Sequence, residues 1–570
     1  MRLVKLALAV LVAGVATLLL AQPASAHAVV VGSTPTDGSR LKASPSSVTV
    51  RFDEPVGLQL GYLRVVDAVG RRVDTGTPSH PGGDGSQISV GLKSGLGDGT
   101  YLASFRIISA DSHPVAGSIR WVVGNGALGA GGGPSDSAPD NQAVSSTLAA
   151  SHWLSFAGVG VVGGSWLIFS LWPAGRRRPV IRRLVWSGWS LAVLGAVGEF
   201  VLQGPYAAGS GLGTALRGQL LDATLHVNSG QLLSVRLVLL GVLGFVLSAL
   251  FAERAVGRRM SWAPEAAAML GVGVVVTFAA SGHSQSANPR WLAVLIDALH
   301  LTAMVVWLGG LVFLLVAAWP RRAAAELTDQ ESEARDAEEV EEAEAEQSED
   351  LAELAAGLPV FSRIAMACVA VLAVTGTIQA WREIGALDAV TSTRYGQLVL
   401  VKVVLFAALI GLGYLARRVV RSPARALARL RRGLLTEVVV GAVVLAVTGV
   451  LIAQPPGKVA LAADRAKPRS TTVAVTQAAS AVVEVDPGVH GPVQFTIQLT
   501  GPIKPTVVSA SASLPAKQLG PIELKLQASG PNTFSASGVV LPSAGQWQVQ
   551  VTVQTSQFDS TTAVATVRVY

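Results

Sequence analysis

Eight long apolar stretches follow one another through the middle of the chain, separated by short polar segments. They lie near residues 150–172, 184–204, 232–252, 265–282, 291–319, 361–381, 397–415 and 434–453. A helix of about 20 apolar residues spans the hydrocarbon layer of a membrane, which is about 30 Å thick. The pattern therefore predicts an α-helical membrane domain over residues 149–455 with eight transmembrane helices.

On both sides of this region apolar and polar residues alternate instead. The segments 48–52, 62–66 and 87–90 show this on the amino-terminal side, and 493–498 and 547–551 on the carboxyl-terminal side. Such alternation is typical of β-strands with one buried face, and several short strands with Gly and Pro turns indicate a sandwich. We predict a multidomain membrane protein with four further segments: an all-β sandwich at 27–124, a flexible linker at 125–148, a second linker at 456–480 and an all-β immunoglobulin-like domain at 481–570.

The first 26 residues have the pattern of a secretory signal peptide. Arg2 and Lys5 precede an apolar core at residues 6–20, and Ala24-Ser25-Ala26 forms a small-residue cleavage site. Cleavage there makes His27 the first residue of the mature protein.

The distribution of arginine predicts the orientation in the membrane. The formal net charge is +7, and the arginines cluster in the loops after the first, third, fifth and seventh apolar stretches. Basic loops remain on the cytoplasmic side, so both β domains are expected outside the cytoplasmic (inner) membrane, on the periplasmic side. The basic charge thus reflects membrane topology and does not indicate a nucleic-acid partner. An acidic run at 331–350 is expected to be a solvated, partly disordered linker, with cytosolic metal buffering as the alternative.

Cysteine usage restricts the chemistry that the chain can carry. Cys368 is the one cysteine, which excludes a disulfide framework and a CxxC metal motif, so metal binding must rest on histidine, carboxylate and methionine. A histidine at a free amino terminus can chelate a metal through its α-amine and Nδ1. Asp111 and His113 would share a face of an extended strand, and a nitrogen-rich donor set suits Cu(II). On spacing alone, the alternative that His27 and His113 are ordinary surface residues stays open.

Ionisable residues in the apolar stretches are a second set of candidates, because burying such groups in a membrane is costly. Asp297, His300 and Met304 are spaced i, i+3, i+7 and would line one helix face, with His300 about 14 Å into its helix at 1.5 Å per residue. Such donors could pass Cu(I) along the helix. The alternative is that the histidines make helix–helix hydrogen bonds. The residues predicted to form a transport path are His152, Glu199, His283, Asp297, His300 and Met304.

Residues 27–124 contain three ordered motifs: His27-Ala with Pro35 and Gly38, Phe52-Asp-Glu-Pro-Val56, and Asp111-x-His113-Pro-Val-x-Gly117. Together these motifs resemble CopC, the periplasmic copper-binding β-sandwich. The resemblance implies Cu(II) held by the amine and imidazole of His27 with the imidazole of His113. It further implies Asp111 as an axial or outer carboxylate and Glu54 as a weaker candidate. The methionine-rich Cu(I) loop of some CopC relatives is absent from this sequence.

The membrane region resembles CopD over about residues 150–455. The motifs are Ser281-Gly-His283-Ser, Asp297-x-x-His300, Trp307-x-Gly-Gly310, Phe361-Ser-Arg363 and Thr393-x-Tyr-Gly396, with Lys402 and Glu437 in later helices. The carboxyl-terminal domain is similar to the YtkA-like family, so the whole order resembles a CopC–CopD fusion. This implies copper homeostasis or resistance, with copper carried across the membrane, most simply inward. The implied partners are the copper ion, the lipid bilayer and an exported copper-delivery protein or reductase.

Two other function classes compete with copper transport. His152, His283 and His300 would be the axial ligands of a b-type haem in an electron-transfer protein. A histidine chelating copper through its own amine can also activate oxygen, but no catalytic acid–base set accompanies it, so we expect no enzymatic activity. ATP-driven transport is not indicated, because the chain has no GxxxxGK[ST] loop.

Overall fold

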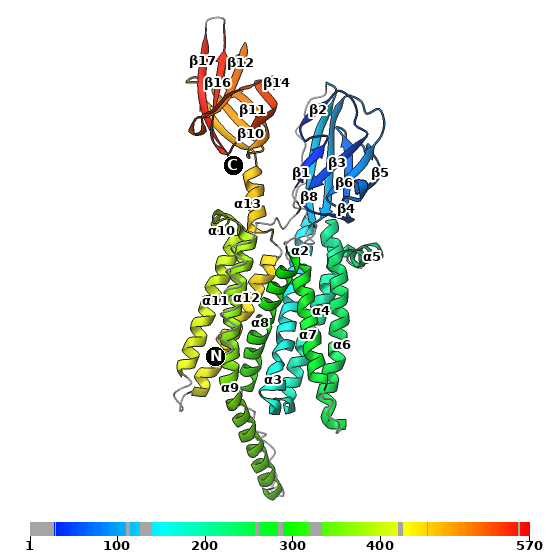
Figure 1. Cartoon of the computed structure of the whole chain (residues 1–570), viewed down its shortest axis with the longest axis vertical. Coiled ribbons are helices and arrows are strands. Elements are labelled where there is room, and N and C mark those ends of the chain that lie inside the picture. The colour runs from blue at the N-terminus through cyan, green and yellow to red at the C-terminus, as the bar shows by residue number, and fades with distance from the viewer. Residues whose placement is uncertain are drawn as a thin grey trace.

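The computed structural model describes residues 28, 30–109, 114–125, 139–256, 262–282, 289–318, 333–419, 426–452, 454–556 and 559–570. Figure 1 shows a bundle of long helices with two β domains at the same end. One β domain comes from the amino-terminal part of the chain and the other from the carboxyl-terminal part. The predicted fold class is confirmed.

The amino-terminal domain is a sandwich of two four-stranded sheets, with strand orders β1-β3-β6-β5 and β2-β8-β7-β4. Alternate residues of the strands, such as Val48, Val50 and Phe52, enter a common core around the buried Trp121. This is the outcome expected for strands with one buried face. The strands are β1 Val30–Thr34, β2 Ser39–Leu41, β3 Ser47–Phe52, β4 Gly57–Asp67, β5 Asp74–Ser79, β6 Gln87–Leu92, β7 Gly99–Ile108 and β8 Pro114–Val123.

Among the described residues, eight helical segments are long and apolar enough to cross a membrane, as predicted. The first span joins α2 and α3, and short helices connect or follow the others. The helices are α2 Pro139–Gly164, α3 Trp166–Ser170, α4 Pro179–Ala208, α5 Gly218–His226, α6 Asn228–Val256, α7 Ala263–Ser281, α8 Arg290–Ala317, α9 Glu333–Ile384, α10 Asp388–Ser392, α11 Arg394–Val419, α12 Ala426–Ile452 and α13 Gly457–Ala466.

Glycines bring the central helices into backbone contact. A Cβ atom on Gly158 of α2 would lie 2.2 Å from the Ala192 nitrogen of α4, and one on Gly309 of α8 would lie 2.1 Å from the Gly160 oxygen of α2. Membrane helices associate through such small residues because lipid provides no hydrophobic driving force between them. Helix α2 is therefore held closely against both α4 and α8.

The carboxyl-terminal domain also has two sheets, with strand orders β14-β15-β11-β10-β9 and β13-β12-β16-β17. Its core surrounds Trp547, whose indole nitrogen donates a hydrogen bond to the Ser543 oxygen. The strands are β9 Arg469–Ala474, β10 Ser480–Asp486, β11 Gly491–Thr500, β12 Val507–Leu514, β13 Leu519–Leu524, β14 Gln527–Gly530, β15 Thr533–Leu541, β16 Gly545–Gln554 and β17 Ser560–Val569.

The structure differs from the expected linkers at three places. Helix α2 begins at Pro139, within the expected linker at 125–148, and α13 and β9 occupy much of the expected linker at 456–480. The described part of the acidic run, from Glu333, is helical and continues directly into the sixth span. Glu and Ala favour helix, and extending an existing helix avoids the cost of nucleation, so an acidic composition did not mean an irregular backbone here.

Candidate functional site

A cavity of about 250 Å³ lies in the half of the bundle that faces the β domains. All eight spans contribute residues to its wall. Most spans are apolar, yet the wall includes charged and histidine side chains. The members of this set are His152, Glu199, Arg236, Asp297, His300, Arg382, Glu383 and Lys402.

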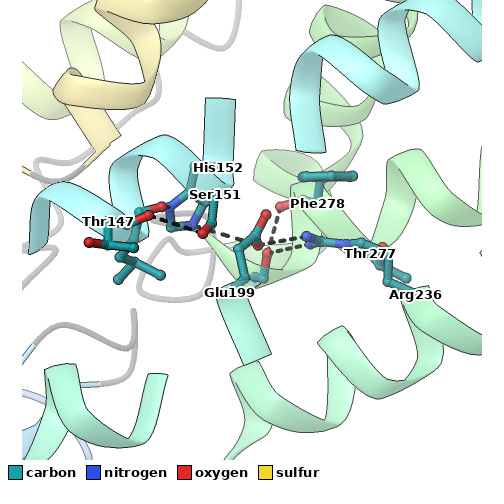
Figure 2. Close-up of polar contacts among 9 residues, drawn as sticks. Thr147, Ser151, His152, Glu199, Arg236, Thr277 and Phe278 are labelled. Carbon is teal, nitrogen blue, oxygen red and sulfur yellow. Dashed lines mark hydrogen bonds and ion pairs between the residues drawn. The ribbon is translucent and has the colours of Figure 1, made fainter. Parts of the chain in front are cut away.

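Glu199 and Arg236 form a buried ion pair on one side of the cavity (Figure 2). The Arg236 Nη1 donates to Glu199 Oε2 at 2.8 Å, and the exposed fractions of the two side chains are 1% and 5%. Arg236 also donates to the hydroxyls of Thr277 and Ser281, and its guanidinium lies 3.4 Å from the centroid of the Phe278 ring. These contacts fix the cation, so Arg236 holds the Glu199 carboxylate in one position beside the cavity.

His152 presents a nitrogen lone pair to that carboxylate. Its Nδ1 lies 3.0 Å from the Leu148 carbonyl oxygen, which can only accept, so Nδ1 carries the hydrogen of the neutral ring. The Nε2 atom then has the lone pair, and it lies 3.7 Å from Glu199 Oε2. Glu199 Oε1 has no hydrogen-bond partner among the described residues. In the neutral form of His152, two electron-rich atoms thus face each other, and a cation between them, a proton or a metal ion, would satisfy both.

His300 is held in the same tautomer on the other side of the cavity. The Thr375 hydroxyl donates to the Val371 oxygen at 2.6 Å, so it can only accept from His300 Nδ1, which lies 2.8 Å away. This leaves Nε2 of His300 as the unprotonated nitrogen. Hydrogen bonding through the other ring nitrogen is the usual way in which proteins orient a metal-binding imidazole.

Asp297, one turn before His300, begins a chain of charged groups. Its Oδ1 accepts from Gln379 Nε2 at 2.9 Å, and its Oδ2 lies 3.7 Å from Arg382. Arg382 also donates to Glu383 at 2.8 Å. Lys458 of α13 lies 3.8 Å from Glu383 and donates to the Arg382 carbonyl oxygen. The helix that leads to the carboxyl-terminal domain therefore contacts the wall of the cavity.

The structure brings four of the predicted path residues together at the cavity: His152, Glu199, Asp297 and His300. Met304 is 9% exposed and belongs to the apolar core of the bundle, not to the cavity wall. It lies one turn deeper than His300, where the helices pack closely. His283 lies outside the described residues, although Gly282 beside it lines the cavity.

Of the candidate copper ligands in the amino-terminal β domain, the structure describes only Glu54. His27, Asp111 and His113 lie outside the described residues. Glu54 is half-buried in the turn between β3 and β4. Among the described residues, no group of three or more His, Cys, Asp and Glu side chains could hold a metal ion. The donors that the structure does place in the cavity are therefore arranged as separate small sets.

Sequence reasoning missed the residues that orient these donors, notably Arg236, Thr375, Gln379 and Lys458. One signal was present, because Arg236 is the only charged residue within the apolar stretch 232–252. A charge at such a position marks a functional site by default. Thr375 and Gln379 carry no comparable signal, since hydroxyl and amide groups are tolerated in membrane helices.

Comparison with known families decides the domain identities. Residues 30–124 match the model of the CopC domain, and residues 355–451 match the model described as copper resistance protein D, or CopD. The chain contains a CopC domain and a CopD domain. The CopD match covers most of α9, all of α10 and α11, and all of α12 except its last residue, and it includes Gln379, Arg382 and Lys402 of the cavity wall. His152 and Glu199 come from helices before the matched segment.

The chain is also similar to individual proteins. The chain is 26% identical over 556 residues to the copper transport protein CutJ of Bacillus subtilis strain 168, covering 94% of each chain. It is 29% identical over 113 residues to copper resistance protein C of Pseudomonas syringae pv. tomato, covering 19% of this chain and 89% of the relative. The crystal structure of CopC from Methylosinus trichosporium OB3b matches at a TM-score of 0.16 and 25% identity, over 17% of this chain and 93% of that one.

Proposed function

We propose that this protein binds Cu(II) at its CopC domain and carries copper inward through the cavity of its membrane domain. The observation that carries the proposal is the pair of imidazoles in the cavity, His152 and His300, each with Nδ1 engaged and Nε2 left as the donor. Imidazole suits copper, and the neighbouring Glu199 and Asp297 add carboxylate oxygens to the cavity wall. The match of 94% of the chain to a copper transport protein supports the same cargo.

The arrangement of donors favours transit over storage. A transport path must bind its ion strongly enough to admit it and weakly enough to release it. Among the described residues the cavity offers pairs of donors and no group of three or more. A copper ion would therefore pass between incomplete ligand sets, completing its coordination with water or with the next donor.

For the CopC domain, the proposed ligands of Cu(II) are the amine and imidazole of His27 and the imidazole of His113. Asp111 would be the axial carboxylate and Glu54 a weaker participant. This assignment rests on the motifs and on the match of residues 30–124 to the CopC family model. Because Cu(II) is the expected form outside and Cu(I) the form expected in the membrane, the proposed partner is an exported reductase or copper-delivery protein.

The haem alternative is not favoured by the structure. The cavity volume of about 250 Å³ falls below the range of about 300–1,000 Å³ usual for small-molecule sites. A porphyrin lies at the large end of such ligands, whereas a copper ion with a few waters fits readily. We infer that the protein acts as a carrier and not as an enzyme.

The proposed orientation places both β domains on the periplasmic side of the inner membrane. Figure 1 shows both β domains at one end of the bundle, and the arginine-rich segment between α3 and α4 lies at the other end. The positive-inside rule assigns that basic end to the cytoplasm. The cavity, near the β domains, then faces the side from which copper arrives.

The proposal is tested by copper uptake into proteoliposomes that contain the full-length protein. Replacing His300 by Ala removes a cavity donor and should reduce the uptake rate by at least about tenfold, since losing one ligand breaks the path. His226→Ala is the matched control, because His226 is an exposed histidine of α5 outside the cavity. The outer Cu(II) affinity should be unchanged in both variants. A folded His300→Ala protein that transports copper at the wild-type rate would exclude this path.

A further inference from the structure

One arginine of the CopC domain donates two hydrogen bonds to the membrane domain. Arg106 of β7 donates from Nε to the Ala207 oxygen at 2.7 Å and from Nη2 to the Tyr206 oxygen at 3.0 Å. Both acceptors belong to the last turn of α4, about 100 residues further along the chain. The two donors of one planar guanidinium thus bind two consecutive carbonyls.

The end of α4 is well suited to this cation. The last carbonyls of a helix lack intrahelical partners and carry partial negative charge, so a cation there is stabilised. Gly209 follows the helix with φ of +66°, and a Cβ atom on it would lie 3.0 Å from Arg106 Cζ. Glycine both permits the left-handed turn that ends the helix and leaves room for the guanidinium.

An apolar contact beside the arginine confirms that the two domains are docked. Along β7, Phe105 and Ile107 point into the sandwich core, so Ile108 should be on the outer face with Arg106. Ile108 is nevertheless only 5% exposed, because it packs against Ala207 of α4. Leu220 and Ala223 of α5 surround this contact. The burial of Ile108 is produced by the membrane domain and not by the sandwich.

The docked strand end lies beside the cavity. Tyr206, whose carbonyl accepts from Arg106, is also one of the residues that line the cavity. In the sheet, Ile108 pairs with Pro114, so β7 ends and β8 begins at the contact. The docking contact therefore fixes this end of the CopC domain beside the cavity wall.

We infer that Arg106 is a positioning residue that holds the CopC domain against the end of α4, so that copper passes from this domain into the cavity without entering bulk solution. The inference rests on the proposed function. A docked donor site supplies its ion at a high effective concentration, whereas a domain on a free tether must release the ion to solution first. The cargo is the copper ion itself. Its reduction from Cu(II) to Cu(I) takes one electron from the proposed exported reductase, which the reductant outside replaces in the test below.

The test measures copper uptake by full-length protein in proteoliposomes, with a reductant outside, in the presence and absence of a membrane-impermeant copper chelator. In wild-type protein loaded with copper, uptake should persist despite the chelator. In Arg106→Ala the chelator should reduce uptake by at least about tenfold, because the effective concentration is lost. At saturating copper without chelator, the variant should match wild type. Arg106→Lys, which keeps one donor group, should lie between them.

Two controls separate docking from folding. Arg64→Ala removes an exposed arginine of the neighbouring strand β4, whose guanidinium lies over the Tyr62 ring, and should behave as wild type. Linking Ile108→Cys to Ala207→Cys with a short thiol reagent, in the Arg106→Ala protein, should restore resistance to the chelator, since these two residues are in contact. The Cu(II) affinity of the CopC domain should be equal in all variants.

The outcomes distinguish this inference from the proposed function. If wild-type protein takes up no copper under any condition, the proposed function fails. If wild-type uptake is substantial and the chelator abolishes it as completely as in Arg106→Ala, copper does pass through solution and the inference is overturned. Equal chelator resistance in wild type and Arg106→Ala would overturn it as well, because docking through Arg106 would then contribute nothing.

Discussion

At the scale of single residues, Arg236 shows why the cavity can keep a carboxylate within the membrane domain. Its guanidinium is 1% exposed and balances the charge of Glu199, while Thr277 and Ser281 accept from its remaining donors. Removing one partner of a buried ion pair leaves the other charge uncompensated, which is far more costly than removing both.

Replacing Arg236 by Ala should therefore lower the free energy of unfolding by about 3–5 kcal/mol, the usual cost of breaking a buried pair. The double variant Arg236→Met with Glu199→Leu leaves no unpaired charge and should be less destabilised than Arg236→Ala alone. Thermal unfolding of the detergent-solubilised proteins measures both. Equal destabilisation in the single and double variants would show that the pair is not coupled in this way.

Asp74 has a comparable role in the CopC domain, outside the membrane. Burial of its side chain tends to raise the pKa, but the hydrogen bond and charge of Arg72 and the Val65 N–H lower it more strongly, so the pKa lies below its ordinary value. A depressed pKa in the folded state contributes stability above the pKa of the unfolded chain, about 3.9. That stability is lost as the pH falls through the folded-state pKa.

Asp74→Asn should thus destabilise the CopC domain at pH 7, and the difference from wild type should shrink as the pH falls below about 4. Denaturant unfolding of residues 27–125, followed by the fluorescence of Trp121, would measure this. Trp121 is the only tryptophan in that segment and is fully buried. A difference that stayed constant between pH 7 and pH 2 would mean that the Asp74 charge does not contribute.

At the scale of elements, α2 and α8 are in direct backbone contact. A Cβ atom on Gly309 would lie 2.1 Å from the Gly160 oxygen and 2.7 Å from the Gly164 Cα atom. These neighbours are backbone atoms of another helix, so a side chain cannot be accommodated by a rotamer change. The helices would have to move apart.

Gly309→Ala should lower the free energy of unfolding by about 1–3 kcal/mol, the typical cost of overpacking. Gly241→Ala in α6 is the matched control, because a Cβ atom there would have nothing within 4 Å. The control should be neutral or stabilised by up to about 1 kcal/mol, since Ala favours helix over Gly. Thermal unfolding in detergent compares them, and equal melting temperatures for the two variants would contradict close helix contact.

The helices and strands also show which features of the fold could be predicted from the sequence. Apolar length alone was sufficient for the eight spans, and alternation was sufficient for both sandwiches, because each is a local property. The i, i+3 spacing of Asp297 and His300 predicts a shared helix face, and both residues line the cavity wall. It did not exclude Met304, because which turns of a helix face a cavity depends on the packing of the other helices. The partners of His300 and Asp297, Thr375 and Gln379, come from α9 and could not be identified from spacing within α8.

At the scale of the whole molecule, the two β domains lie at one end of the bundle. The positive-inside rule predicts that this end is outside. The native Cys368 is buried, so labelling of introduced cysteines has little background. Val69 of the CopC domain is 73% exposed and Val540 of the carboxyl-terminal domain is 58% exposed. Arg183, at the basic end of α4, is also exposed.

An impermeant maleimide applied to intact spheroplasts should label Val69→Cys and Val540→Cys, and it should label Arg183→Cys only after the membrane is permeabilised. The reason is that an even number of spans returns both soluble domains to one side. The measurement is the mass shift or fluorescence of each single-cysteine protein. Labelling of Arg183→Cys in intact spheroplasts would reverse the proposed orientation.

The contact between Arg106 and the end of α4 also has a consequence for the order in which the protein is made. Synthesis begins at the amino terminus, so the CopC domain emerges before α4, whose Tyr206 and Ala207 lie about 100 residues later. Its core cluster contains only its own residues, so it can fold as a unit while the helices are still being synthesised. Arg106 and Ile108 then remain solvated on the nascent domain until α4 is inserted. Docking is therefore a late step of biogenesis, and a chain that ends before α4 should carry a folded CopC domain with an exposed Ile108.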